Sequence, residues 1–156
     1  MKSKTILAAL LLVIAVSLPA STFCQTGVVL TKSTLRPMLE NMGYEVNELS
    51  PTNYEVSVTI TYKVYMAIAF SPDESRIWLT TFFYDKNPAS FTNDKLIKLL
   101  QSNWTTGASV FALDGTKLKM TRPVENRNLT PLLLRKEIES QARSVESTEA
   151  VWQDKK

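Results

Sequence analysis

The sequence predicts an α+β domain built on an antiparallel sheet. Apolar and polar side chains alternate without a break from Tyr54 to Tyr62, which is typical of a half-buried strand. Residues 108–122 (ASVFALDGTKLKMTR) carry Asp-Gly between two alternating runs, which indicates a β-hairpin. Segments with apolar residues at three- and four-residue spacing indicate helices before the first run, between the two runs and after the hairpin. The expected order is α-β-β-β-α-β-β-α.

The first 24 residues are expected to be a signal peptide. Lys2 and Lys4 precede Ile6 to Val16, an apolar run of 11 residues that is followed by small side chains. A membrane-spanning helix needs about 20 residues, so this pattern favours a secretory leader over an uncleaved anchor. We therefore expect an exported protein, periplasmic or extracellular, with one domain over residues 25–156 and a C-terminal tail that frays from about residue 147.

The charge balance gives no indication of a nucleic-acid partner. Loss of Lys2 and Lys4 with the leader reduces the 18 basic residues to 16, against 15 acidic residues. The mature domain is thus nearly neutral, and no basic stripe runs along it. We expect neither nucleic-acid binding nor membrane contact beyond the cleaved leader.

The residue types needed for most catalytic chemistry are missing from the sequence. It has no histidine, and its one cysteine, Cys24, lies at the end of the leader, where its lipidation stays an open question. Ser-His-Asp triads, Cys-His pairs and sites with histidine or thiolate metal ligands are therefore excluded. The four glycines are too dispersed for a phosphate-binding loop, and adjacent Asp73 and Glu74 are interpreted as a solvated turn. We expect no enzyme activity, no metal and no cofactor.

The first helix is expected over Ser33 to Met42. Ser33 or Thr34 is the expected cap, Pro37 would then lie in the first turn, and Gly43 ends the helix in the left-handed conformation. The apolar face comprises Leu35, Met38, Leu39 and Met42.

Three strands are expected to follow this helix. They are Tyr54 to Tyr62, Val64 to Phe70 and Arg76 to Tyr84, with a short or irregular lead-in over Tyr44 to Leu49. A turn over Ser71 to Ser75 joins the last two strands, so these should pair antiparallel.

The second half of the chain is expected to contain a helix, the hairpin and a last helix. The second helix spans Asn93 to about Asn103 and the last helix spans Pro131 to about Val145, capped by Thr130. The inward residues of the last helix are Leu134, Ile138, Ala142 and Val145, and Trp152 indicates one further contact. The buried stripe of the second helix is expected to be Leu96, Ile97, Leu100 and Trp104.

In the hairpin, Asp114-Gly115 is the expected two-residue type I′ loop. That loop places Leu113 opposite Thr116, Phe111 opposite Leu118 and Ser109 opposite Met120. Alternation along the strands then gathers Phe111, Leu113, Leu118 and Met120 on one face and places Lys117 and Lys119 on the other.

Four local segments carry a resemblance to a known family. They are LENMGYEV at 39–46, LIKLLQSNW at 96–104, ASVFALDGTKLKM at 108–120 and TPLLLRKEI at 130–138. In this layout the chain, over about residues 33–146, resembles the YbjN family of bacterial proteins, which shares the fold of type III secretion chaperones. The resemblance implies a twisted antiparallel sheet with helices packed on one face, and a tendency to form homodimers. It also implies roles in binding extended client segments or in regulation. The predicted leader distinguishes this chain from those relatives, which are typically cytoplasmic.

The strongest candidate for a binding surface is the strand from Arg76 to Tyr84, which is apolar on both faces. The candidate partner-binding residues are Tyr65, Trp78, Phe82 and Tyr84, and Tyr54 is a further candidate that would extend them across a neighbouring strand. Three interpretations stay open: ordinary core covered by a curled sheet or by the segment with Trp152, a dimer or partner surface, and a small-ligand pocket.

The resulting hypothesis is a non-enzymatic exported domain. It would bind a protein or peptide through an apolar sheet face, or act as a dimeric adaptor or regulator. The alternative is a cystatin-like or nuclear-transport-factor-like cone around a small ligand, with or without catalytic activity, for which Tyr62, Arg76 and Asp85 are the polar candidates. A structural envelope protein without a ligand is a third hypothesis.

Overall fold

The computed structural model describes residues 27–153, so the predicted leader lies outside the described part. The helices and strands are α1 (Lys32–Asn41), β1 (Asn47–Ser50), β2 (Asn53–Thr59), β3 (Lys63–Phe70), β4 (Arg76–Phe83), a 3-10 helix (Pro88–Ser90), α2 (Asn93–Ser102), β5 (Val110–Asp114), β6 (Lys117–Glu125), α3 (Pro131–Ser147) and α4 (Glu149–Trp152). None of the helices within these residues is long and apolar enough to cross a membrane.

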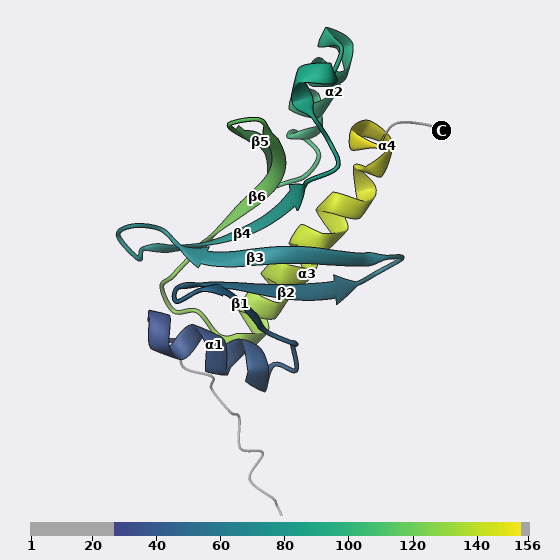
Figure 1. The fold of residues 1–156 in the computed structure, drawn as a ribbon. Helices are drawn as coiled ribbons and strands as arrows, with labels where there is room; N and C mark the ends of the chain where they lie inside the picture. The colour runs from purple at the N-terminus through teal and green to yellow at the C-terminus, as the bar shows by residue number, and fades with distance from the viewer. Residues whose placement is uncertain (1–26, 154–156) are drawn as a thin grey trace, which may run out of the picture.

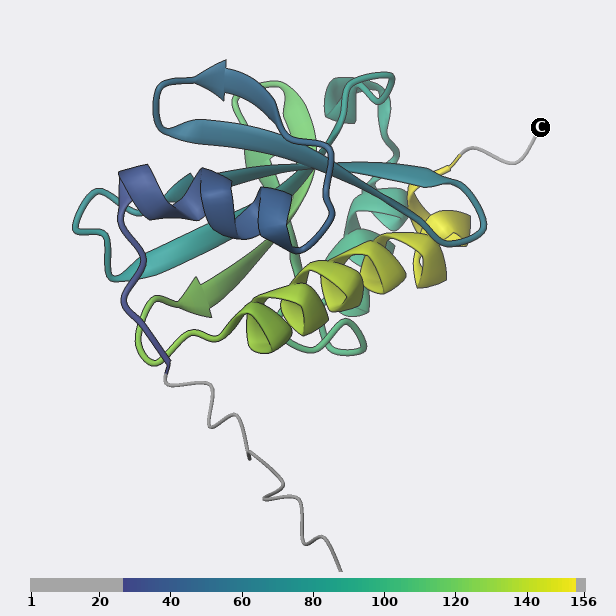
Figure 2. The ribbon, with the colours of Figure 1, turned by 90° about the horizontal axis from the view of Figure 1, so that it is seen from below.

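The strands form one six-stranded antiparallel sheet in the order β1-β2-β3-β4-β6-β5. The long helix α3 crosses one face of this sheet diagonally (Figure 1, Figure 2). The predicted α+β class and the order of the main elements are confirmed. The lead-in expected before the first long strand forms a short edge strand, β1, and the expected strand from Tyr54 ends at Thr59, so Tyr62 lies in the turn that follows.

Cross-strand register shows that the core lies on one face of the sheet. Tyr54 pairs with Ile68, Ile68 with Leu79, and Thr81 with Met120, and all these side chains are buried. The same layer contains α1, because the Tyr54 hydroxyl donates to the Lys32 carbonyl. Both α1 and α3 therefore cover this face, and the opposite face carries side chains that are half-buried or exposed.

The first helix differs from expectation at its start. It begins one residue earlier, after Thr31, whose backbone N–H donates to Thr34 Oγ1 over 2.9 Å. Pro37 consequently lies in the second turn rather than the first. Gly43 adopts φ = 85° and its N–H donates to the Glu40 carbonyl, which confirms the predicted helix end.

The hairpin between β5 and β6 has a different register from the predicted one. Phe111 pairs with Met120 and Leu113 with Leu118, so the loop is Gly115-Thr116. Gly115 has φ = 58° while Thr116 stays at negative φ, which is the pattern of a type II′ turn rather than type I′. Because the shift is two residues, each side chain keeps its predicted face, but Leu113 is exposed.

The predicted inward stripe of α3 is confirmed, since Leu134, Ile138, Ala142 and Val145 are all buried. Gln141, which is fully buried, joins them. It accepts from Ser109 Oγ over 2.7 Å and donates to the Met120 carbonyl over 2.9 Å, so α3 is hydrogen-bonded to the sheet as well as packed on it.

The predicted stripe of α2 is wrong for three of its four residues; the fourth, Leu96, is half-buried and packs against the core. The helix buries Leu99, whereas Ile97 and Leu100 are exposed and Trp104 is 91% exposed. The reason is position: α2 stands beyond the end of the sheet and contacts mainly β5 and α4 (Figure 1). Helical periodicity identified an apolar face there, but no layer of the protein covers it.

The turn between β3 and β4 is organised by Asp73. Its carboxylate accepts from Ser71 Oγ over 2.6 Å and from Ser75 Oγ over 2.8 Å. These hydrogen bonds, first that from Ser71 and then that from Ser75, lower the pKa of Asp73 from 3.8 to about 2. The exposed carboxylate predicted at this turn therefore organises the turn through its hydrogen bonds to Ser71 and Ser75.

Acid titration tests this role of Asp73. A pKa lowered by folding stabilises the folded state above the unfolded pKa, and the effect disappears as the pH falls through the folded value. The advantage in melting temperature of the wild type over Asp73→Asn is therefore expected to be full above about pH 5, to fall as the pH drops through the range from 3.8 to about 2, and to vanish below that range. A difference that stays constant over this range would show that the carboxylate charge is unimportant to the turn.

Candidate functional site

The face of the sheet opposite the helices carries the four candidate aromatic residues. We call Tyr65, Trp78, Phe82 and Tyr84 the aromatic surface. Tyr65 is 50% exposed and Tyr84 is 75% exposed, while Trp78 and Phe82 are half-buried. Trp78 lies between Ala69 of β3 and Pro123 of β6, which are its register partners on that face. The structure therefore gathers these residues on a face without a helical cover.

This placement bears on the three interpretations of the aromatic strand face. Ordinary core does not describe Tyr65 or Tyr84, because a large part of each ring is exposed. Tyr54, the further candidate, lies instead on the helix-covered face and is 5% exposed. That assignment was wrong because Tyr54 pairs with Ile68, so its side chain points to the same face as the core of β3.

Lysine side chains lie over the rings of the aromatic surface. The Nζ of Lys63 is 5.2 Å from the centroid of Tyr65, and that of Lys117 is 5.7 Å from the centroid of Tyr84. Phe82 and Tyr84 stack on each other at 5.5 Å. Such contacts hold the rings in place and give the margin of the surface a positive charge.

A cleft of about 430 Å³ opens beside this surface, where β3 and β4 separate. Tyr62 and Asp85, two of the polar residues considered for a small-ligand site, both line it. Arg76, the third, is at the other end of β4 and forms an ion pair with Glu125 at 3.0 Å. Thr81 also lines the cleft. Sequence reasoning missed it because its place in the strand is an ordinary core position.

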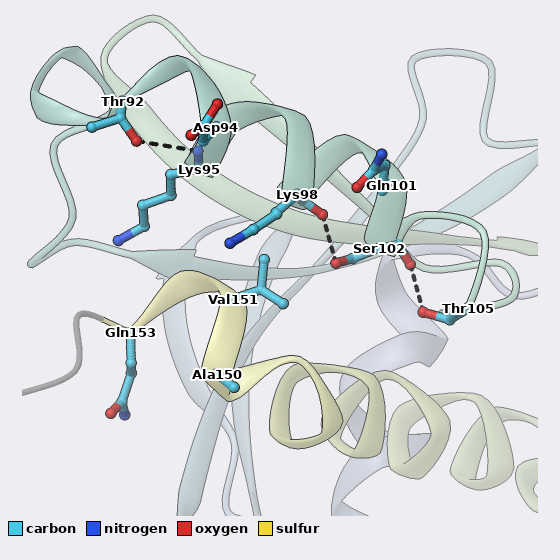
Figure 3. A pocket seen from close by; sticks show the side chains of 10 residues that line it. All are labelled: Thr92, Asp94, Lys95, Lys98, Gln101, Ser102, Thr105, Ala150, Val151 and Gln153. Carbon is cyan, nitrogen blue, oxygen red and sulfur yellow. Dashed lines mark hydrogen bonds between the residues drawn. The ribbon is translucent and has the colours of Figure 1, made fainter.

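A larger hollow, of about 850 Å³, lies between α2 and α4 (Figure 3). Lys95, Lys98 and Val151 extend into the space between the two helices, whereas Gln153 points away from α2. The hydroxyls that line it serve α2 itself: Thr92 caps the helix and Ser102 donates to the Lys98 carbonyl. These hydroxyls are therefore used within α2.

Across residues 27–153, no three Asp, Glu, His or Cys side chains come together in a group that could hold a metal ion. The open face and its cleft contain the four candidate aromatic residues and two of the three polar candidates.

Comparison with known proteins identifies the fold. No protein-family model matches the chain, and no curated protein matches its sequence. Among solved structures, a chain of the HopA1-SchA chaperone-effector complex superposes with a TM-score of 0.53 and 9% identity, covering 74% of this chain and 90% of that one. A structure of the Yersinia pestis type III secretion chaperone SycH with a stable fragment of YscM2 gives a TM-score of 0.47 and 18% identity, covering 74% and 98%.

The similarity to the HopA1-SchA chain confirms the predicted fold: the protein is an α+β domain with a secretion-chaperone-like architecture. Identities this low establish the architecture alone. Function has to be inferred from the surface of this chain.

Proposed function

We propose that this protein is a non-enzymatic exported domain that binds a protein or peptide partner through its aromatic surface. The observation that carries the proposal is the gathering of Tyr65, Trp78, Phe82 and Tyr84 on a sheet face that no helix within residues 27–153 covers. Aromatic side chains dominate binding energy at protein interfaces, and monomeric proteins rarely leave them exposed together.

The chemistry of the margin indicates what kind of partner would fit. Lys63 and Lys117 lie over exposed rings, so acidic side chains next to apolar ones would find both a cation and an aromatic face. An uncovered sheet face between strands suits an extended segment better than a globular domain. We infer a partner segment that is extended, rich in apolar side chains and acidic at intervals.

Export is part of the same proposal and rests on the leader-like first 24 residues. The similar HopA1-SchA structure is that of a chaperone-effector complex, which supports a partner-binding role for the present fold. A secretion-chaperone role in the strict sense is not proposed, because the predicted leader would take this chain out of the cytoplasm.

Affinity capture tests the proposed surface. The mature domain, residues 25–156, is immobilised and exposed to an extract of its own extracytoplasmic compartment, and retained polypeptides are identified by mass spectrometry. We expect one polypeptide in near-stoichiometric amount. Tyr84→Ser should lower its affinity about 30-fold, since loss of an aromatic hot spot costs about 2 kcal/mol. Tyr84 is 75% exposed, so the variant should stay folded.

The matched control is Trp104→Ser, which removes an exposed aromatic side chain from the end of α2, away from the sheet face. Equal loss of the polypeptide with both variants, or equal retention, would contradict binding at the aromatic surface. An empty column would contradict a tight partner altogether. Light scattering on the free domain tests the predicted homodimer in the same preparation.

A further inference from the structure

The strands β3 and β4 pair along only half of their length. Their register runs from Ala67–Thr80 to Phe70–Ile77, although β3 begins at Lys63 and β4 continues to Phe83. Beyond Ala67 and Thr80, β3 stays with β2, and β4 follows β6 towards α2 (Figure 1). The strong twist of the sheet therefore splits it between its two central strands.

The cleft in this split extends from the open face towards the helix layer. Its inner wall is apolar, with Val64 from β3, Phe83 from β4 and Trp152 from α4. Phe83 and Trp152 pack with ring centroids 4.7 Å apart, and the indole N–H donates to the Val145 carbonyl over 3.0 Å. The mouth is formed by three members of the aromatic surface: Tyr65, Phe82 and Tyr84.

Two residues that line the cleft carry a hydroxyl without a hydrogen-bond partner. The two hydroxyls are Tyr62 Oη and Thr81 Oγ1, and within residues 27–153 these are the buried side-chain polar atoms left unsatisfied. Buried polar groups in native proteins nearly always find a partner, so each exception requires an explanation. Both exceptions here belong to residues that line the same small space.

The position of Thr81 makes its hydroxyl costly to the free protein. Thr81 is 6% exposed, and the neighbouring residues on its face of β4 are Leu79 and Phe83. Valine has the same shape and would fill this core position without an unsatisfied polar atom. At Tyr62, burial first and the charges of Glu149 and Glu146 next raise the pKa to about 12, so its phenol stays protonated and able to donate at neutral pH.

We propose that the cleft between β3 and β4 binds a small uncharged molecule with an aromatic or cyclic body and one hydroxyl group. The apolar wall takes the ring, and the ligand hydroxyl accepts from Tyr62 Oη and donates to Thr81 Oγ1. A charged group is disfavoured because the inner wall is apolar. An anion is disfavoured most, because Glu55 and Asp85 line the cleft against one cation, Lys63, and the charges of Glu149 and Glu146 act on Tyr62. The volume of about 430 Å³ is in the range of ligand pockets.

This site adjoins the proposed partner surface and shares Tyr65, Phe82 and Tyr84 with it. It is tested with small probes on the protein alone, so its failure and the failure of partner binding are distinguishable. The probes are p-cresol, toluene and 4-methylbenzoate, which differ only in the group opposite the methyl. Binding is followed by NMR shifts of backbone amides.

We expect p-cresol to shift the amides of Tyr62, Thr81 and Phe83 with a dissociation constant of about 1 mM or tighter. Toluene should bind about tenfold more weakly, and 4-methylbenzoate should not bind at this site. Toluene binding as tightly as p-cresol would overturn the role of the hydroxyls. Absence of saturable shifts with p-cresol, or equal binding of the carboxylate, would overturn the proposed ligand class.

Thr81→Val provides the second readout. It should raise the melting temperature by about 2 to 4 °C, because it removes an unsatisfied buried hydroxyl, and weaken p-cresol binding several-fold. Tyr62→Phe should likewise raise the melting temperature and weaken p-cresol binding. Thr121→Val is the matched control: its hydroxyl already bonds Thr80 Oγ1 at 3.0 Å, so it should not raise the melting temperature or alter p-cresol binding. A melting temperature lowered by Thr81→Val would mean that its hydroxyl is satisfied within the free protein, which would overturn the proposal.

Discussion

Replacement of Asn126 by alanine is expected to lower the free energy of unfolding by about 3 to 5 kcal/mol. Asn126 follows β6 directly and is 4% exposed. Its Oδ1 accepts from the Leu30 N–H over 2.8 Å, and its Nδ2 donates to the Leu30 carbonyl over 2.8 Å and to the Glu74 carbonyl over 2.9 Å. One side chain thus attaches both the segment before α1 and the β3–β4 turn to the end of the sheet.

The expected loss of unfolding free energy is large because alanine leaves buried backbone groups without a hydrogen-bond partner. The backbone groups of Leu30 are buried and would lose their partner in both directions, and each unsatisfied buried group costs about 1 to 3 kcal/mol. Urea unfolding should show a lower midpoint with an unchanged slope. Exchange of the Leu30 amide hydrogen should also become faster in the variant.

The exposed residue Asn41, at the end of α1, provides the control for Asn126. Asn41→Ala should change the free energy of unfolding by less than about 0.5 kcal/mol. Asn126→Asp keeps the acceptor for the Leu30 N–H but loses both donations, so its loss should resemble that of alanine. A loss below about 1 kcal/mol for Asn126→Ala would show that the segment around Leu30 is not held to the sheet in solution.

The periodicity of apolar residues predicted buried positions correctly where the apolar face of a helix or strand packs against a neighbouring layer of the fold. The stripe of α3 was correct because its apolar residues repeat along the helix and the sheet covers all of them. The stripe of α2 failed because Leu100 and Trp104 mark an apolar face that no layer covers. A sequence pattern identifies the apolar face of a helix, but it does not show which part of the fold packs against that face.

The register of the hairpin between β5 and β6 was predicted wrongly for a different reason. Asp-Gly is a strong turn signal, but Gly115 can occupy either the first or the second position of a two-residue loop. The two choices differ by two residues in register and leave every side chain on the same face, so the alternation of Phe111 and Leu118 could not separate them. Only their different cross-strand partners distinguish the two registers.

The candidate site was predictable in part for the same reasons. Alternation along β4 placed Trp78 and Phe82 on one face, but whether that face was covered depended on where the helices packed. Residues such as Asn126, Gln141 and Thr81 gave no signal, because a single buried polar side chain leaves no periodic trace. The cleft depends on the separation of two strands that are adjacent in sequence, and no local pattern encodes that separation.

Truncation of Trp152 to alanine is expected to cost about 3 kcal/mol of unfolding free energy. Trp152 lies at the end of α4, is 8% exposed and packs against Phe83. Its loss removes a large buried ring and the hydrogen bond to the Val145 carbonyl. The same change removes the inner wall of the cleft between β3 and β4, so the cavity left behind would join the existing space rather than be filled by neighbouring side chains.

Trp104→Ala makes the same chemical change at a position that is 91% exposed. Its expected effect is below about 0.5 kcal/mol, so chemical unfolding of the two variants side by side isolates the contribution of burial. Equal effects would mean that the C-terminal helix is detached in solution and that the split sheet stands open from both sides. A large difference would mean instead that α4 packs against the sheet in solution, with Trp152 forming the inner wall of the cleft.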